Sequence, residues 1–151
     1  MNANWIDSPV GPLTIWEEDG TIVRLDWKAI KESAGSETLD RAISELHDYF
    51  EGSQKGFSVP LRPKGNEFQQ RFLKLLAEIP YGETRTYGDM AHELGASAQA
   101  IGQACGANPI PVIIPCHRVL GADGLGGFSG AGGVEAKITL LKHEGAASLL
   151  I

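Results

Sequence analysis

Residues 108–119 constrain this chain more than any other stretch, and they read Asn-Pro-Ile-Pro-Val-Ile-Ile-Pro-Cys-His-Arg-Val. The segment 112–114 is apolar and β-branched, is bracketed by prolines and is too short for a helix, so it predicts a strand buried on both faces. Because Pro115 has no N–H to donate, this strand is predicted to end there, with Cys116 at its mouth. A thiol held at the edge of a core beside His117 has the rigid seat and the neighbouring base that a sulfur nucleophile needs.

A cysteine–histidine pair does not by itself indicate a reactive site, because a lone cysteine is usually a small buried hydrophobe. The longer motif around this pair distinguishes between a reactive and a structural cysteine. Pro-Cys-His-Arg-Val preceded by Asn-Pro-Ile-Pro resembles the active-site signature of the O6-alkylguanine-DNA alkyltransferases, also called methylated-DNA–protein-cysteine methyltransferases. The match continues in Ile-Pro-Tyr-Gly-Glu-Thr at 79–84 and in Leu-Lys-His-Glu-Gly at 141–145. It is strong over residues 68–145 and weaker, though still recognisable, over 7–13.

The bulk properties are those of an ordinary soluble globular protein. Residues 1–7 have neither a basic region nor an apolar run, so no signal peptide is expected, and no segment approaches the length of a membrane span. Cys105 and Cys116 give neither a disulfide framework nor a zinc-binding spacing, which favours the reducing cytoplasm. The net charge of −6 argues against a generic nucleic-acid binder, because such proteins bind by neutralising phosphates. That charge conflicts with the DNA substrate that the resemblance implies.

The first part of the chain, residues 1–61, is predicted to be a small domain of one sheet and one helix. We expect two hairpin strands, an edge strand and a helix, at residues 13–17, 21–27, 57–61 and 38–50 respectively. Asp19-Gly20 is the hairpin turn signal, and Gly52 ends the helix. The family resemblance gives this domain a ribonuclease H-like shape and a structural role.

Residues 62–151 are predicted to form a second, mostly helical domain, so the expected fold class is α+β. Helical spacing of apolar residues predicts helices at 66–78, 87–94, 98–106 and 134–143. Thr86 and Ser97 can cap the two middle helices and Gly95 separates them, which is the pattern of a helix-turn-helix. The resemblance makes this the winged-helix-like domain that binds DNA and carries out the alkyl transfer.

The helix predicted at 98–106 carries almost no side-chain bulk. The small residues on it and at its ends are Ala96, Ala98, Ala100, Gly102, Ala104, Gly106 and Ala107. Such a helix can pack tightly against its neighbours, or it can approach a groove that an ordinary helix, about 10–12 Å across, cannot enter. The minor groove of DNA is only about 6 Å wide and is widened by the proteins that bind it. The resemblance implies the second interpretation, because the family places this helix in the minor groove.

The target implied by the resemblance is guanine alkylated at O6, with thymine alkylated at O4 as a second candidate. A base inside a duplex has to be rotated out of the stack before its alkyl carbon can be reached. Cys116 then attacks that carbon and keeps the alkyl group as a thioether, so one molecule repairs one base and needs neither a cofactor nor a metal. By the same match, His117 acts as the base through a water, Glu144 orients the imidazole, and Asn108 tightens the turn around the cysteine.

The family match also assigns residues to the substrate and to DNA. Tyr87 is expected to hold the flipped nucleotide, and Val119 and Ser129 are expected to offer main-chain groups to the guanine edge. Arg118 is either a further contact to substrate or DNA or a structural ion-pair partner, and the sequence leaves both open. Gln99 stands where the family has an arginine that fills the gap left by the flipped base. Glutamine can still occupy that gap and hydrogen-bond the orphaned cytosine, but it lacks the charge and the planar fork of arginine.

The expected partner is double-stranded DNA that carries O6-alkylguanine, bound through the minor groove by a monomer in the cytoplasm, without any membrane contact. Residues 86–117 contain no lysine or arginine, so DNA binding is expected to be weak and salt-sensitive. Arg85 and Arg118 flank that stretch, and backbone N–H groups at helix N-termini have to supply further phosphate contacts.

Two other functions stay open on the sequence alone. The first is a sensor of alkylated bases, which flips the base without chemistry; such proteins resemble this one but typically carry tryptophan at the position of Cys116. The second is a cysteine hydrolase of small molecules that uses Cys116, His117 and Glu144. Turnover separates the three functions, because a hydrolase cycles, an alkyltransferase stops after one event, and a sensor does not react.

Overall fold

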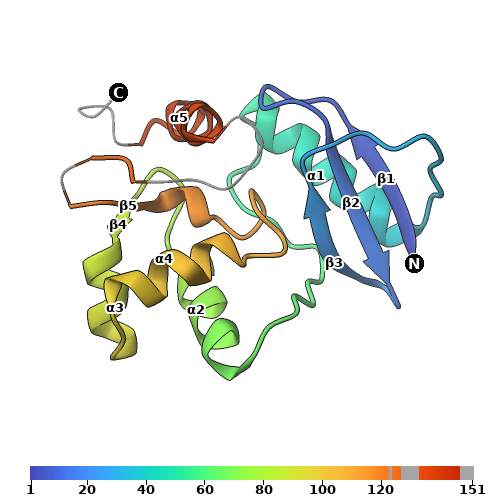
Figure 1. Ribbon diagram of the computed structural model, residues 1–151. Coiled ribbons are helices and arrows are strands. Elements are labelled where there is room, and N and C mark those ends of the chain that lie inside the picture. Colours follow the sequence, from blue (N-terminus) through green and yellow to red (C-terminus); the bar gives the residue numbers. More distant parts are fainter. Residues whose placement is uncertain (123, 127–132, 147–151) are drawn as a thin grey trace. The chain divides into compact units, whose positions relative to one another are not determined.

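In the computed structural model, the chain divides into two compact units, Met1–Lys64 and Gly65–Ile151 (Figure 1). The structure describes residues 1–122, 124–126 and 133–146, so most of the glycine-rich stretch 121–133 lies outside it. The first unit contains a sheet and a helix and the second is mostly helical, which confirms the α+β fold class. No helix within the described residues has the length and apolar character needed to cross a membrane.

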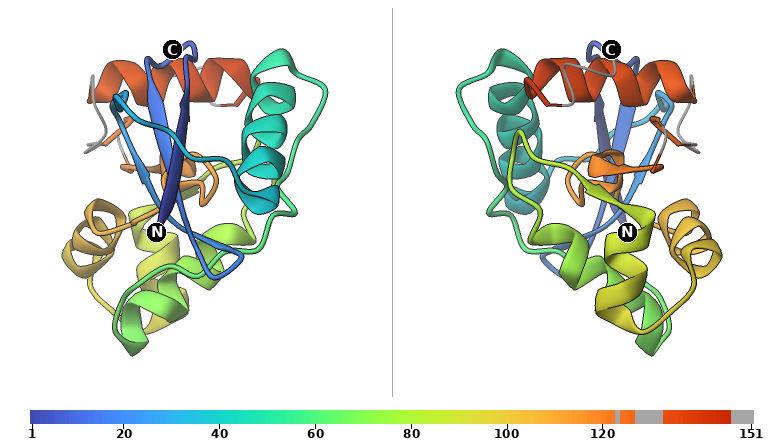
Figure 2. Two further views of the ribbon diagram at one scale, coloured as in Figure 1. Left: turned by 90° about the vertical axis from the view of Figure 1, so that its right-hand side faces the viewer. Right: turned by 90° about the vertical axis from the view of Figure 1, so that its left-hand side faces the viewer.

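The N-terminal unit is a three-stranded antiparallel sheet packed against one helix. The strands β1 (Asn2–Ile6), β2 (Leu13–Glu18) and β3 (Thr21–Asp26) lie in the order β1-β2-β3, and α1 (Glu37–Glu51) packs against them (Figures 1 and 2). Asp19 and Gly20 have φ angles of 52° and 78°, which a tight hairpin turn requires. The predicted hairpin and the predicted helix are therefore confirmed.

The prediction of a third strand at 57–61 is wrong. This segment touches the sheet only through an isolated bridge between Leu61 and Ile22. The third strand is β1, which pairs with β2 from Asn2 opposite Glu17 to Ile6 opposite Leu13. Polar residues such as Asn2 and Asn4 weaken the apolar alternation of β1, so local pattern does not reveal a strand that forms through pairing with β2.

Among its described residues, the C-terminal unit contains four α-helices, which are α2 (Glu67–Ala77), α3 (Tyr87–Leu94), α4 (Ala98–Gly106) and α5 (Val134–His143). Asn66, Thr86 and Ser97 cap α2, α3 and α4 by accepting a hydrogen bond from the backbone N–H three residues further on. Gly95, with a φ of 65°, ends α3. The four predicted helices are confirmed, and α2, α3 and α4 contact one another.

A short parallel strand pair ties the start of α3 to the cysteine-bearing segment. Strand β4 (Arg85–Thr86) pairs with β5 (Val119–Leu120), with Arg85 opposite Val119 and Thr86 opposite Leu120. Tyr87 is the first residue of α3 and follows β4 directly. This pairing therefore brings Tyr87 close to the turn that begins at Cys116.

The predicted strand at 112–114 is wrong. The N–H of Ile114 donates to the carbonyl of Ile110 at 2.9 Å, so the chain closes a tight turn at this point. Val112 has a φ of 72°, in the left-handed region that costs a β-branched residue about 1–3 kcal/mol. All three residues of the segment are buried. The β-branched residues at 112–114 are buried, as such residues often are, but they do not pair as a strand.

Candidate active site

Cys116 is the first residue of the short 3-10 helix η1 (Cys116–Arg118), and 6% of its surface is exposed. Its N–H donates to the carbonyl of Ile114 at 2.9 Å. The side chain of Asn108 spans the same turn, donating from Nδ2 to the Ile114 carbonyl at 2.9 Å and accepting at Oδ1 from the N–H of Ile110 at 3.0 Å. These bonds fix the backbone on which the thiol is mounted.

Burial raises the pKa of the Cys116 thiol above its ordinary value, because low-dielectric surroundings disfavour a thiolate. A hydrogen bond from the Asn108 side chain and the positive charge of Lys137 lower that pKa, but the upward shift prevails. The resting group is therefore a thiol, and its attack on an electrophile requires a base.

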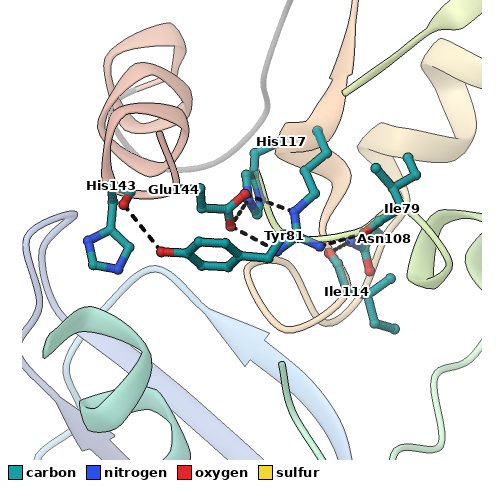
Figure 3. A network of polar contacts seen from close by, with 8 residues as sticks. Ile79, Tyr81, Asn108, Ile114, His117, His143 and Glu144 are labelled. Atoms are coloured by element: carbon teal, nitrogen blue, oxygen red, sulfur yellow. Dashed lines mark hydrogen bonds and ion pairs between the residues drawn. The ribbon is translucent and has the colours of Figure 1, made fainter. Parts of the chain in front are cut away.

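His117 has the geometry of that base. Its Nε2 lies 2.8 Å from Oε2 of Glu144, and both side chains are fully buried (Figure 3). Because a carboxylate only accepts hydrogen bonds, Nε2 carries the proton and Nδ1 keeps a free lone pair. Nδ1 is buried without a hydrogen-bond partner among the described residues. Burial lowers the pKa of His117 more than the bond to Glu144 raises it, so the imidazole stays neutral.

Arg118 forms the ion pair that the sequence had left as one of two alternatives. Its Nε donates to Oε1 of Glu144 and its Nη2 to Oε2, each at 2.9 Å, and 7% of its surface is exposed. Nη1 donates to the carbonyl of Ile79 at 2.6 Å. The carboxylate of Glu144 is thus shared by Arg118 and His117, and its orientation toward the imidazole is fixed from both sides.

The motif at 79–84 supports this network from outside. Besides the Ile79 carbonyl, it supplies Tyr81, whose ring centroid lies 5.8 Å from the guanidinium carbon of Arg118. The Tyr81 hydroxyl donates to the carbonyl of His143 at 3.3 Å, next to Glu144 at the end of α5 (Figure 3). The match of this motif to the family therefore has a structural basis that sequence reasoning did not identify.

Lys137 is a site residue that sequence reasoning missed. It has no exposed surface, and its Nζ donates to the carbonyl of Val119 at 2.7 Å. The same Nζ lies 5.8 Å from the centroid of the Tyr87 ring. Burial lowers the pKa of Lys137. Helical spacing could have revealed it, because Lys137 stands three and four residues before Leu140 and Leu141, both on the buried face of α5.

Tyr87 lies close to the backbone of Gly126, where a larger residue would be strained. A Cβ added to Gly126 would lie 2.8 Å from Cε2 of Tyr87 and 3.0 Å from its hydroxyl oxygen, and the φ of Gly126 is +72°. The N–H of Val119 donates to the Cys116 carbonyl, while its own carbonyl accepts from Lys137. Cys116, Val119, Lys137 and Tyr87 therefore form one connected set around the thiol.

The predicted binding residue Gln99 is not part of this set. Gln99 is an exposed residue in the first turn of α4, on the face shared with Ala98, Gly102, Gln103 and Gly106, all of them exposed. This face carries no charged side chain. Ser129 lies outside the described residues. Within the described part of the chain, no three histidine, cysteine or acidic side chains are grouped as a metal ion would require.

Comparison with protein families matches nearly the whole chain in two parts. Residues 2–63 match "6-O-methylguanine DNA methyltransferase, ribonuclease-like domain" and residues 67–146 match "6-O-methylguanine DNA methyltransferase, DNA binding domain". A "Methylated-DNA--protein-cysteine methyltransferase" of Mycobacterium tuberculosis is 43% identical over 149 residues, covering 92% of this chain and 89% of that protein. The constitutive protein of that name from Bacillus subtilis is 40% identical over 152 residues, covering 91% of this chain and 92% of its own.

Solved structures give the same result. The crystal structure of Mycobacterium tuberculosis O6-methylguanine methyltransferase has a TM-score of 0.85 to this chain at 38% identity, covering 98% of this chain and 96% of that one. The structure of Mycobacterium tuberculosis OGT in complex with DNA has a TM-score of 0.83 at 39% identity, covering 95% and 93%. The chain belongs to the 6-O-methylguanine DNA methyltransferase family.

Proposed function

We propose that this protein is a DNA repair alkyltransferase that transfers the alkyl group of O6-alkylguanine in DNA to Cys116, once per molecule. The observation that carries the proposal is a buried thiol followed in the chain by a neutral imidazole, whose Nδ1 has no partner among the described residues and whose Nε2 is bonded to a carboxylate fixed by Arg118. Family membership supports the same activity, because relatives about as long as this chain bear the name methylated-DNA–protein-cysteine methyltransferase.

The transfer is a displacement at the alkyl carbon. The Sγ–H proton of Cys116 passes through a bridging water to Nδ1 of His117, and Glu144 stabilises the imidazolium that forms. The sulfur lone pair forms the S–C bond while the C–O6 bond breaks, and the guanine takes both electrons and then a proton. The product is a thioether, which has no acyl or phosphoryl centre for water to attack. The alkylated protein is therefore the end product, and no cofactor is consumed.

Helix α4 is the element that we expect to enter the minor groove. A Cβ added to Gly102 or Gly106 would meet none of the described residues within 4 Å, so packing within the described part of the chain does not require glycine at either position. Glycine inside a helix costs about 0.5–1 kcal/mol relative to alanine. Glycines that internal packing does not require, on an exposed helix face, are consistent with close approach to DNA, as minor-groove binders require. Gln99, on the same face, is the residue that we expect to fill the gap left by the flipped base.

DNA affinity then rests on shape more than on charge. The exposed face of α4 offers glutamines and small residues, and residues 86–117 provide no lysine or arginine for the phosphates. Backbone N–H groups at helix N-termini and a few flanking cations have to make those contacts. We expect a monomer that binds duplex DNA weakly and selects the lesion mainly by the fit of the flipped base.

The test is transfer from a duplex oligonucleotide with a labelled O6-methylguanine, followed by peptide mapping. The label should appear on Cys116 in the parent protein and in a matched Cys105→Ser control, and it should be absent from Cys116→Ser. Cys105 is the right control because it is the other thiol and burial raises its pKa to about 12. Label on Cys105, or a repaired duplex without labelled protein, would refute the assignment.

A further inference from the structure

We propose that Lys137 is a positioning residue whose buried ammonium group stabilises the thiolate that Cys116 forms during transfer, while its hydrogen bond fixes the Val119 carbonyl in the turn that carries the thiol. The proposal rests on the proposed function for its biological meaning. It can nevertheless be tested on the thiol alone, without an alkylated base.

The geometry links the two residues through one short turn. Lys137 projects from α5, and its Nζ donates to the carbonyl of Val119 at 2.7 Å. The N–H of Val119 donates in turn to the carbonyl of Cys116. A movement of the ammonium group would therefore move the peptide groups that carry the thiol. Contacts between α5 and η1 connect the same two elements.

A buried ammonium group needs a reason, because removing a charge from water costs several kcal/mol unless other groups compensate for it. Lys137 has no exposed surface. Its contacts include a neutral carbonyl and, at 5.8 Å, the face of the Tyr87 ring. A thiolate forming at Cys116 would add a negative charge near this ammonium group, so the charge of Lys137 favours the state in which the sulfur can react.

The other ionisable groups near Cys116 are paired with another side chain, are neutral, or do not stabilise a thiolate. On η1, Arg118 is paired with Glu144 and His117 is neutral. Cys105, from α4, raises the pKa of Cys116's neighbour Lys137, as does Cys116 itself, and Tyr87 presents its ring from α3. Among the described groups, Lys137 is the one whose charge lowers the pKa of Cys116 against the effect of burial.

Two roles are thus divided between two residues. His117 takes the proton of the thiol, and Lys137 keeps its own proton and supplies a fixed positive charge at the turn that carries the sulfur. The competing interpretation is that Lys137 only ties α5 to β5 through the Val119 carbonyl. A charge acting on the thiol shifts the pH dependence of its reaction, whereas a purely structural tie does not.

The experiment measures the rate at which iodoacetamide alkylates Cys116 as a function of pH, with peptide mapping to separate Cys116 from Cys105. Lys137→Gln keeps a donor for the Val119 carbonyl but removes the charge, and Lys142→Gln removes an exposed lysine from the same helix as the matched control. We expect Lys137→Gln to raise the midpoint of the profile by about one unit or more. The rate near pH 7 should then fall about tenfold and recover at high pH. Lys142→Gln should follow the parent profile.

A second variant separates charge from packing. Lys137→Ala should react slowly with iodoacetamide and should be rescued by added ethylammonium, whereas ethanol, which is similar in size but uncharged, should not rescue it. An unshifted midpoint in Lys137→Gln, or equal rescue by ethanol, would overturn the proposal. So would failure of both Lys137 variants to fold, since the lysine would then be a structural tie. If the parent protein reacts with iodoacetamide but not with O6-benzylguanine, the proposed function fails while this result stands.

Discussion

Helix α4 and the turn 116–119 are separated by residues 107–115 in the chain, and they differ in the charge that they carry. The exposed face of α4, where DNA is expected, has no charged side chain. The turn is buried, yet an arginine, a lysine, a glutamate and a histidine converge on it. Charge is worth most where water is excluded and is screened at a wet surface. Of these two regions, the turn proposed to carry the reaction holds charged side chains, and the helix face proposed to bind DNA holds none.

The largest expected effect comes from the base and its carboxylate. His117→Ala and Glu144→Gln should each slow alkyl transfer by about 10²–10⁴-fold, the usual contribution of a general base. The double variant should be little slower than the slower single variant, because the two residues act as one unit. Single-turnover rates with O6-benzylguanine provide the measurement. Multiplicative losses would mean that His117 and Glu144 act independently.

The contrast between buried and exposed charge can be tested on stability with two arginines. Arg118→Met removes one partner of a buried pair, and it should lower the free energy of unfolding by about 3–5 kcal/mol because Glu144 stays buried. Arg85→Met breaks an exposed pair with Glu93 at 3.6 Å, with about half of each side chain in solvent, and should cost about 0.2–1 kcal/mol. Urea denaturation of both variants is the measurement. Equal losses of unfolding free energy in the two variants would show that burial does not determine how much these ion pairs stabilise the protein.

Gln99 tests whether α4 recognises DNA without charge. Gln99→Arg should speed repair of a duplex lesion and steepen the salt dependence of DNA affinity by about one unit of slope, as one added phosphate contact does. Its rate with free O6-benzylguanine should hardly change, because the free base needs no flipping. If Gln99→Ala repairs duplex DNA as fast as the parent protein, Gln99 does not fill the gap left by the flipped base.

The smallest expected effect belongs to Gly102. Because a Cβ there would meet none of the residues that the structure describes, Gly102→Ala should stabilise the protein by about 0.5–1 kcal/mol. The same methyl group should weaken binding to duplex DNA if this face approaches the groove closely, and leave transfer from O6-benzylguanine unchanged. Thermal unfolding and a duplex titration measure the two effects. If Gly102→Ala stabilises the protein and leaves DNA binding unchanged, α4 does not enter the minor groove.

Much of the fold follows from local chemistry in the sequence. The caps Thr86 and Ser97 and the stop at Gly95 define the helix pair because each satisfies backbone groups within a few residues. The two errors have non-local causes. β1 forms only by pairing with β2, and the turn at 112–114 depends on Asn108 and on the burial of the whole segment.

The site was predictable as a set of residues but not as a network. The motif places Cys116 and His117 together, and the resemblance adds Glu144. The choice between two roles for Arg118, the free Nδ1 of His117 and the presence of Lys137 depend on contacts between residues far apart in the chain. A contiguous motif identifies the residues that belong to it. Buried ion pairs join residues far apart in the chain, so they can be identified only from the three-dimensional structure.

Whether Cys116 accepts one alkyl group and then stops is tested most directly by intact mass after incubation with excess O6-benzylguanine. The free base removes DNA binding and flipping from the measurement, so only the thiol and its buried partners decide the outcome. The expected result is one benzyl adduct per molecule, located on Cys116, with one guanine released and no further reaction. Continuing release of guanine from unmodified protein would indicate a hydrolase. An unmodified protein that releases no guanine would contradict the alkyl transfer itself.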